Sequence, residues 1–433
     1  MGQTNNLHTS GFGPVAYRWV VFFILSAVYL LVYFHRQAPA VLAVDLKHSL
    51  DINGAWLGFI SAAYFYPYAL MQFPAGPLVR KWGARVVLGG ALGVAALGSL
   101  LLALADGPFI ALLGRALTGL AVGVVLVALL EIISRWFRQS HFVNMVGLLL
   151  AMGGLGVFAG SAPLAYLDHL LGWRGSFLVI AAVSVSLVLC IWLLTRDTPE
   201  QMGFPPVEER PTPPAGPEKR GTFGGLGSVL GSPRFWPPAV WGFCALAVFT
   251  SLGGLWGGPY LRHVYGLSKL ETGHILSMQA VGMVLGSPLL AYLSGRRWGS
   301  RRRVLAGAGL VLVILCSIMM LIPARLPVIG LYAWFAGLGL ATIAAAPLAL
   351  SIARENVFPG ASALATGACN FFFLIGGAVM QQVVGWLLDV HGGSGVYTAA
   401  HFAWSFKLYW ALALIALAAA LLVREPMPRP VYG

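Results

Sequence analysis

Twelve apolar runs follow one another along this chain of 433 residues. An apolar helix of ~20 residues crosses the hydrocarbon core of a bilayer, and a bilayer offers its backbone no other hydrogen-bond partner. The approximate runs are 18–43, 54–78, 85–105, 108–133, 142–167, 174–195, 235–261, 272–295, 303–323, 327–353, 361–388 and 402–423. The sequence therefore predicts an all-α membrane protein with twelve transmembrane helices.

The composition excludes an ordinary soluble protein. Only 9% of the residues are charged, whereas soluble domains carry about 25%. The net charge of +13 does not indicate a nucleic-acid partner, because the basic residues recur in short loops between the runs. The four cysteines lie far apart within apolar runs, so we expect no metal site and no disulfide framework. We also expect no cofactor.

Lysine and arginine are distributed unevenly between alternate loops. With both termini inside, 19 of the 27 basic residues fall in cytoplasmic segments and 6 in outer segments. This asymmetry follows the positive-inside rule. We expect a multi-pass protein of a plasma or bacterial inner membrane, in contact with membrane lipid, with both termini in the cytoplasm.

A proline-rich segment separates the first six runs from the last six. Between Arg196 and Arg234, prolines alternate with glycines and charged residues, a composition that cannot bury an apolar core. The predicted organisation is a six-helix bundle at 1–195, a cytoplasmic linker at 196–234 and a second six-helix bundle at 235–433.

The two halves repeat a short sequence at corresponding loops. Residues 80–85 read Arg-Lys-Trp-Gly-Ala-Arg after the second run, and residues 296–301 read Arg-Arg-Trp-Gly-Ser-Arg after the eighth. The two copies occupy corresponding loops, and the chain runs through both in the same direction relative to the membrane. This implies a parallel repeat, in which a pseudo-two-fold axis along the membrane normal relates the bundles.

A cation lies deep in the first run. Arg36 shares a helical face with Tyr29 and Tyr33, which precede it by seven and three positions. A charge at this depth costs at least ~2.5–3.5 kcal/mol and normally faces a protein interior or a water-filled cavity. A guanidinium matches a carboxylate, so we expect Arg36 and Tyr33 to bind a small anion. The alternative is that Arg36 extends to the outer surface.

Polar residues at helical spacing supply further candidates for substrate binding. Tyr64, Tyr68 and Gln72 recur every four residues in the second run, which predicts one stripe facing a cavity. In the seventh run, glycines and a proline interrupt residues 251–260, and irregular backbone at membrane depth is tolerated where it lines a cavity.

The remaining candidates each have a structural alternative. Trp256 and Tyr260 could face substrate or belong to an interfacial aromatic belt. Gln279 and Asn370 are isolated amides that could contact substrate or hydrogen-bond neighbouring helices.

The loop after the second run resembles that of the major facilitator superfamily, which reads roughly Gly-x-x-x-Asp-Arg-x-Gly-x-Arg. The matching positions are Gly76, Lys81, Gly83 and Arg85, while Arg80 replaces the aspartate. Similar motifs occur at Arg115-Ala116-Leu117-Thr118-Gly119, at Gly172-Trp173-Arg174 and at Pro199-Glu200-Gln201-Met202-Gly203. The resemblance implies a monomeric transporter with two rocking bundles, a midplane site and a conformational gating role for this loop.

The first run is closest to the anion:cation symporter branch of that superfamily. That branch places Asp-Arg in its first span, and its arginine helps to bind the substrate anion. Arg36 matches the arginine, His35 replaces the aspartate, and Val122 stands where the branch often has an acidic residue. The resemblance therefore implies an anion-binding role for Arg36.

No carboxylate lies near the centre of any apolar run. His35 is the first candidate for proton coupling, because imidazole changes charge near pH ~6.5; protonated His35 and Arg36 could receive an anion together. Glu131 could pair with Arg135 at i+4 instead of carrying a proton. Arg115 could contact the anion or bond to backbone carbonyls. A uniporter, or a substrate that carries its own proton, remains an alternative.

These observations favour a secondary transporter for a small organic anion of the carboxylate type, working by alternating access as a proton symporter. The alternative is a proton-driven exporter of drugs or metabolites, which fits poorly with Arg36 and with the lack of a central carboxylate. A receptor or an intramembrane enzyme is less favoured. The histidines show no metal-binding spacing and no nucleotide-binding loop occurs, so we expect no enzyme activity.

Overall fold

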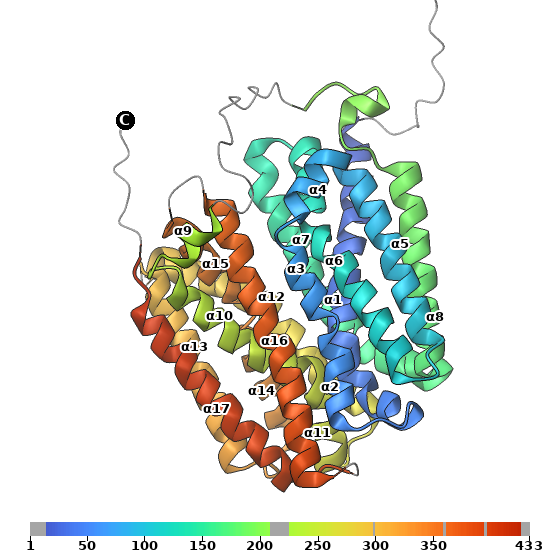
Figure 1. Ribbon diagram of the computed structural model, residues 1–433. Helices are drawn as coiled ribbons and strands as arrows, with labels where there is room; N and C mark the ends of the chain where they lie inside the picture. The colour runs from blue at the N-terminus through green and yellow to red at the C-terminus, as the bar shows by residue number, and fades with distance from the viewer. Residues whose placement is uncertain (1–13, 208–224, 298, 358–360, 394–395, 426–433) are drawn as a thin grey trace, which may run out of the picture.

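The computed structural model describes residues 14–207, 225–297, 299–357, 361–393 and 396–425, and every regular element in them is helical (Figure 1). The first half contains α1 (Pro14–Ser49), α2 (Gly54–Ala62), α3 (Phe65–Met71), α4 (Ala75–Trp82), α5 (Ala84–Ala103), α6 (Pro108–Trp136), α7 (Gln139–Ala159), α8 (Ala162–Leu194) and η1 (Pro199–Met202). Residues 208–224 of the predicted linker, and Trp298 of the predicted repeat, lie outside the described residues.

The second half contains both short elements and long helices. They are α9 (Leu226–Leu230), α10 (Trp236–Val248), η2 (Phe249–Trp256), α11 (Gly257–Val264), α12 (Lys269–Tyr292), η3 (Leu293–Arg297), α13 (Arg301–Leu321), α14 (Val328–Ala341), α15 (Ala346–Glu355), α16 (Ser362–Gly392) and α17 (Ala399–Leu422). Among these, η2 is a π-helical turn that joins α10 to α11.

The described residues contain 11 helices that are long and apolar enough to cross a membrane. The remaining predicted span, 54–78, is divided among α2, α3 and α4 because Pro67 and Pro74 have no N–H to donate to the carbonyls four residues earlier. The Leu70 carbonyl accepts from Phe73 N instead, at 3.4 Å. The all-helical, multi-pass fold agrees with the prediction.

A turn inside α8 separates the fifth and sixth predicted spans, 142–167 and 174–195. Gly172 has a φ of 69°, a conformation that favours glycine. Residues 162–171 therefore continue the predicted fifth span after α7, and the part of α8 that follows Gly172 is the sixth span. The turn falls in the gap between these two predicted spans.

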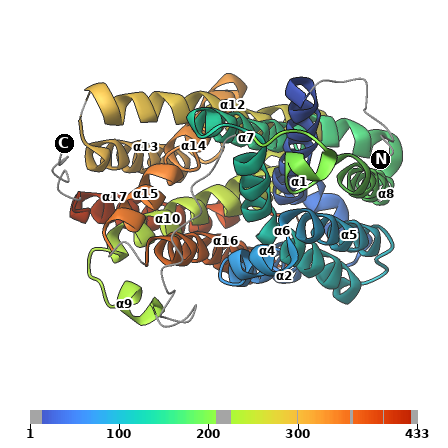
Figure 2. The ribbon, with the colours of Figure 1, turned by 90° about the horizontal axis from the view of Figure 1, so that it is seen from above.

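The helices of the two halves lie side by side (Figures 1 and 2). Between the halves, α1 packs against η2 and α11, α2 and α3 pack against α16, and α7 packs against α12. We call the end of the molecule with the C-terminus of α8 and the N-terminus of α10 the linker end. The opposite end, where α1 leads into α2 and α11 leads into α12, is the far end.

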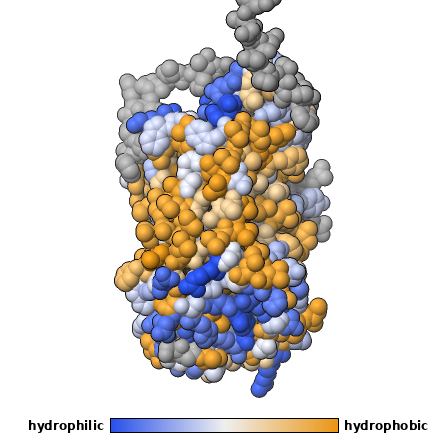
Figure 3. Space-filling model, turned by 90° about the vertical axis from the view of Figure 1, so that its right-hand side faces the viewer, coloured by the Kyte–Doolittle hydropathy of each residue, from blue (hydrophilic) through white to orange (hydrophobic). Residues whose placement is uncertain are grey.

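Apolar side chains cover the outside of the helices in a broad middle band, with hydrophilic residues gathered below it (Figure 3). Leu97 of α5 and Leu189 and Leu193 of α8 are 49%, 55% and 68% exposed. Side chains of this kind are stable on such a surface when lipid covers them. The protein is an integral membrane protein that crosses the bilayer several times.

Candidate functional site

A cavity of about 700 Å³ lies between the two halves. Its walls come from α1, α3, α6 and α7 of the first half and from α10, α12, α15 and α16 of the second. The lining belongs to the linker-end part of α6, α7, α12 and α16, so the cavity lies in that half of the molecule. We call it the central cavity.

Arg36 lies in the wall of the central cavity and is only 8% exposed. Its Cζ is 5.7 Å from the centre of the Tyr33 ring and 5.5 Å from that of Phe65. Its Nε has no hydrogen-bond partner, and within the described part of the chain no carboxylate forms an ion pair with it. Since a buried charge is stable only when it is paired, this guanidinium is suited to bind an anion.

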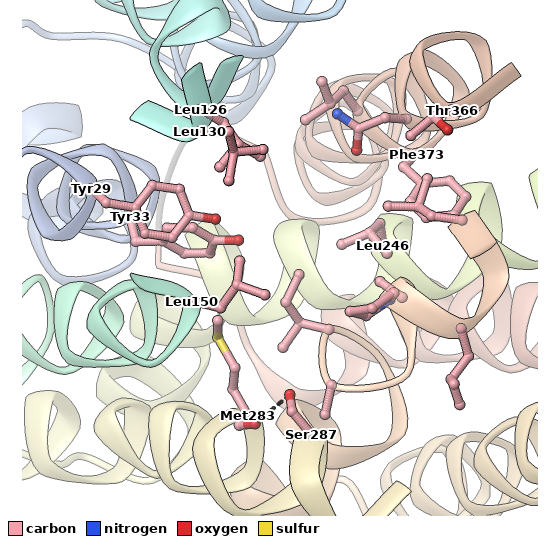
Figure 4. A pocket seen from close by; sticks show the side chains of 18 of the residues that line it. Tyr29, Tyr33, Leu126, Leu130, Leu150, Leu246, Met283, Ser287, Thr366 and Phe373 are labelled. Atoms are coloured by element: carbon pink, nitrogen blue, oxygen red, sulfur yellow. Dashed lines mark hydrogen bonds between the residues drawn. The ribbon is translucent and has the colours of Figure 1, made fainter. Parts of the chain in front are cut away.

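Tyrosines surround the guanidinium on the first half. Tyr29 and Tyr33 pack edge to face with ring centres 5.3 Å apart, and both hydroxyls point into the cavity (Figure 4). Tyr68 lines the cavity from α3. The helical spacing predicted from the sequence thus brings Tyr33, Tyr68 and Arg36 to one wall, where phenols can donate hydrogen bonds to an anion.

An amide pair connects the two halves at the same cavity. Asn370 Nδ2 of α16 donates to Gln72 Oε1 at 2.9 Å, and both residues line the cavity. Each amide therefore already has a hydrogen-bond partner within the protein, and a substrate that contacts either one must replace that hydrogen bond. The predicted candidates Gln72 and Asn370 do come together with Arg36.

His35 and Arg115 lie inside the first half and do not line the central cavity. Pro39 has no N–H to donate to the His35 carbonyl, and Arg115 Nη1 donates to this oxygen instead, at 2.8 Å. The imidazole is 1% exposed and lines a separate void beside Leu92 of α5. Consecutive residues point ~100° apart around a helix, so His35 and Arg36 do not share one anion site.

Tyr64 packs against Tyr68, with ring centres 5.8 Å apart, but unlike Tyr68 it does not line the central cavity. It is completely buried, its hydroxyl donates to the Val32 carbonyl at 3.2 Å, and the Arg115 Cζ lies 4.7 Å from its ring centre. The break between α2 and α3 falls at Ala63 and Tyr64, but both residues keep right-handed helical backbone angles, so Tyr64 and Tyr68 stay neighbours. Tyr64 positions Arg115 within the bundle.

Three candidates of the second half are buried away from the central cavity. Trp256 Nε1 donates to the Gln381 carbonyl at 3.0 Å, and the Tyr260 hydroxyl donates to the Pro323 carbonyl. Gln279 Nε2 donates to the Gly253 carbonyl at 3.2 Å. These contacts hold α11 and α12 in place around the π-helical turn η2.

Gln37, which the sequence did not single out, connects η2 to the first half. Its Nε2 donates to the same Gly253 carbonyl at 2.9 Å. A π-helical turn disrupts the regular backbone ladder and leaves carbonyls for side-chain donors. The glycine-rich run at 251–258 indicates irregular backbone, but it does not reveal this partner.

Glu131 is placed at the linker end of α6, outside the central cavity. Its Oε1 is 2.7 Å from Arg135 Nη2, and the two side chains are 40% and 47% exposed. This is the i+4 pair that the spacing allows. The geometry gives Glu131 a structural role at the helix end.

The predicted gating loop is hydrogen-bonded to an acidic residue that the sequence did not reveal. Gly83 has a φ of 83°, and Arg85 N, in the first turn of α5, donates to Asp197 Oδ1 at 2.7 Å. A carboxylate is favourable at a helix N-terminus. Gly76 lies in α4, and Arg80 and Lys81 are exposed near its end, so Asp197 supplies the negative charge that the loop lacks.

The second half repeats this arrangement. Glu425, which follows α17, accepts from Arg302 N at 2.6 Å in the first turn of α13. Residues 193–197 read Leu-Leu-Thr-Arg-Asp and residues 421–425 read Leu-Leu-Val-Arg-Glu. This second repeat was the signal in the sequence that could have revealed Asp197.

Ion pairs join the halves at the far end. Asp45 of α1 is 3.3 Å from Arg262 Nη1 of α11 and 3.1 Å from Lys269 Nζ of α12. Lys269 also pairs with Asp168 of α8, whose side chain is 1% exposed. We call these four residues the far-end ion-pair cluster.

A carboxylate of the second half also caps a helix of the first. Asp389 of α16 accepts from Gly54 N at 2.9 Å and from Ala55 N at 2.7 Å, at the N-terminus of α2. The Tyr397 hydroxyl donates to the same carboxylate at 2.7 Å. The far end is thus held closed while the cavity occupies the linker-end half.

A model of the Major Facilitator Superfamily matches residues 25–381. The chain belongs to this superfamily. It is 24% identical over 419 residues to a putative tartrate transporter of Agrobacterium vitis, covering 92% of this chain and 90% of the relative. It is 23% identical over 414 residues to a probable galactarate/D-glucarate transporter of Escherichia coli, covering 88% and 90%.

A solved superfamily member has the same fold. A bacterial homologue of the human lysosomal transporter Spinster, described as inward-facing and unoccupied, superimposes with a TM-score of 0.76 at 18% identity, over 94% of this chain and 97% of that one. The protein is a membrane transporter of this superfamily and not an enzyme. The resemblance noted in the sequence is confirmed.

Proposed function

We propose that the protein carries a small organic anion of the carboxylate type across the membrane, with Arg36 as the main anion contact. The observation that carries this proposal is a buried guanidinium without a protein carboxylate, set among tyrosines in a cavity between the two halves. The curated relatives named for tartrate and for galactarate/D-glucarate support an anionic substrate.

The movement we propose is alternating access by a single chain. Residues 1–195 and 235–433 rock as two bundles about the central cavity, connected by residues 196–234. With the linker end in the cytoplasm, as the distribution of basic residues indicates, the described arrangement is the inward-open one. The far-end ion-pair cluster and the Asp389 cap must then separate when the protein opens outward.

We propose proton symport as the coupling mode. Moving one negative charge inward against an inside-negative potential costs ~2.3 kcal/mol per 100 mV, and a proton that travels with it removes this cost. We place proton uptake on Asp45 or Asp168, because Arg262 and Lys269 of the other half would leave these carboxylates on opening. His35 lacks access to the central cavity. Asp168→Asn is expected to alter the pH dependence of uptake more than His35→Gln; the opposite ranking would return the role to His35.

Uptake into proteoliposomes tests the function. A panel of radiolabelled carboxylates is offered with and without an inward proton gradient to the parent protein, to Arg36→Ala and to Arg138→Ala, a control that removes an exposed arginine. Charged hydrogen bonds contribute ~1.5–3 kcal/mol, so Arg36→Ala should weaken uptake of the preferred acid roughly 10- to 100-fold. Equal uptake by Arg36→Ala and Arg138→Ala would remove Arg36 from the site.

A further inference from the structure

The two walls of the central cavity differ in chemistry. The first half contributes Arg36 and the phenols of Tyr29, Tyr33 and Tyr68. Among the lining residues in the described part of the chain, Arg36 alone carries a formal charge. One cation can neutralise one carboxylate. A second carboxylate on the same substrate would lie in this cavity without a partner, which is unfavourable in a medium of low dielectric constant.

The wall from the second half is largely apolar. Leu246 of α10, Met283 of α12 and Phe373 of α16 line it, and the first half adds the apolar Leu126 and Leu150 beside its polar groups (Figure 4). These side chains offer a substrate van der Waals contact and no hydrogen bonds. They would exclude water from an apolar substrate body and would leave hydroxyl groups unsatisfied.

The few polar groups on that wall already donate within the protein. Ser287 Oγ donates to the Met283 carbonyl at 2.9 Å, and Thr366 Oγ1 donates to the Ser362 carbonyl at 3.0 Å. Asn370 donates to Gln72 across the halves. A polyhydroxylated acid would find few free donors there, and a site that leaves substrate hydroxyls unpaired binds such a substrate weakly.

From these contacts we infer that the substrate is a monoanion with an apolar body: one carboxylate, or an equally charged acid group, attached to an aliphatic or aromatic group. The acid group lies at Arg36 between the phenols, and the apolar body lies against Leu246, Met283 and Phe373. This inference rests on the proposed function and narrows it. The inferred substrate differs from the tartrate and the galactarate/D-glucarate for which two of the relatives are named.

Three acids of six carbons test the inference. Hexanoate carries one carboxylate and an apolar chain, adipate adds a second carboxylate, and gluconate adds hydroxyls. Binding to the purified full-length protein in detergent is measured by isothermal titration at pH 7.5, with titration into protein-free detergent to correct for partition into micelles. We expect the Kd of hexanoate to be at least tenfold lower than those of adipate and gluconate, and we expect Arg36→Ala to abolish the difference.

The outcomes separate the two proposals. Arg36-dependent binding in which adipate or gluconate equals or exceeds hexanoate would overturn the monoanion inference and leave the carboxylate transporter intact. Failure of all three acids to bind, at concentrations where the protein remains folded, would overturn both. Arg36-dependent preference for hexanoate supports both.

A second cation supplies an independent test. Met283→Arg places a guanidinium on the wall that faces the first half, and Met283→Leu is the matched control that keeps this wall apolar. If one cation against an apolar wall sets the selectivity, Met283→Arg should shift the ratio of adipate to hexanoate affinity at least tenfold toward adipate. An unchanged ratio in a folded Met283→Arg protein would contradict the inference.

Discussion

Replacing Lys269 by methionine should open the far end of the transporter. Lys269 Nζ is 3.1 Å from Asp45 Oδ1 and also pairs with Asp168, so one ammonium holds α12 against both α1 and α8. Methionine keeps much of the volume and removes the charge. Asp45 retains Arg262 at 3.3 Å, whereas Asp168 loses its ion-pair partner.

The magnitude follows from the exposure of the two partners. The side chain of Asp168 is 1% exposed and that of Lys269 is 22% exposed. Removing one partner of a buried pair costs ~3–5 kcal/mol, and exposed pairs contribute ~0–1 kcal/mol. We take about 2 kcal/mol for this half-shielded pair. Water can reach the carboxylate once the far end opens, so the lost ion pair destabilises only the closed state. The equilibrium between the closed and open far end therefore shifts roughly 30-fold toward the open state.

Spin labels at the far end measure this shift. One label at Ser49→Cys and another at Val396→Cys, in a background without the four native cysteines, report the distance between the halves by pulsed electron paramagnetic resonance. Lys269→Met should add a population at longer distance. Adding Asp168→Asn removes the unpaired charge and should return the population toward the closed distance. An unchanged distance distribution in Lys269→Met would refute the reasoning, as would failure of Asp168→Asn to reverse a change.

Three further changes have direct readouts. Gly258→Ala should separate α11 from α1, because a Cβ there would lie 1.7 Å from the Ala40 carbonyl oxygen; the same label pair should report a longer distance, and an unchanged distance would contradict this. Tyr33→Phe removes a hydroxyl that faces the cavity (Figure 4) and should raise the Kd of the preferred carboxylate about tenfold, whereas an unchanged Kd would exclude a bond from this phenol. Asp197→Asn weakens the cap on α5 by about 0.5–1 kcal/mol. It should lower the midpoint of thermal unfolding in detergent more than Glu131→Gln, which breaks only an exposed ion pair. Equal midpoints for the two variants would show that the cap does not stabilise the protein.

The helices were predictable because lipid imposes one requirement on every span. A run of ~20 apolar residues has to satisfy its own backbone, so composition alone reveals it. The exceptions lie where backbone geometry matters more than hydropathy. Pro67 and Pro74 divide the second span into three helices, whereas the turn at Gly172 falls in the predicted gap between the fifth and sixth spans. A hydropathy pattern counts apolar residues and does not report which carbonyls lose their donors.

The site was predictable on one wall and hidden on the other. Arg36, Tyr33 and Tyr68 are polar residues at membrane depth with helical spacing, and such residues are unfavourable there unless they face a cavity. Leu246 and Phe373 line the same cavity, but in the sequence they are indistinguishable from residues that fill a core. The apolar wall, which sets the proposed specificity, therefore required the packing of both halves.

The far-end ion-pair cluster was hidden for a different reason. Asp45, Asp168, Arg262 and Lys269 lie at helix ends, where charges are ordinary in membrane proteins, and they are far apart in the sequence. The sequence directed the search for a coupling group to membrane depth, and His35 was found there. Residues that change partners when the bundles move need not lie deep in a helix; they need only lie where the two halves meet. A search for coupling groups in related transporters should therefore begin with carboxylates whose cationic partners belong to the other bundle.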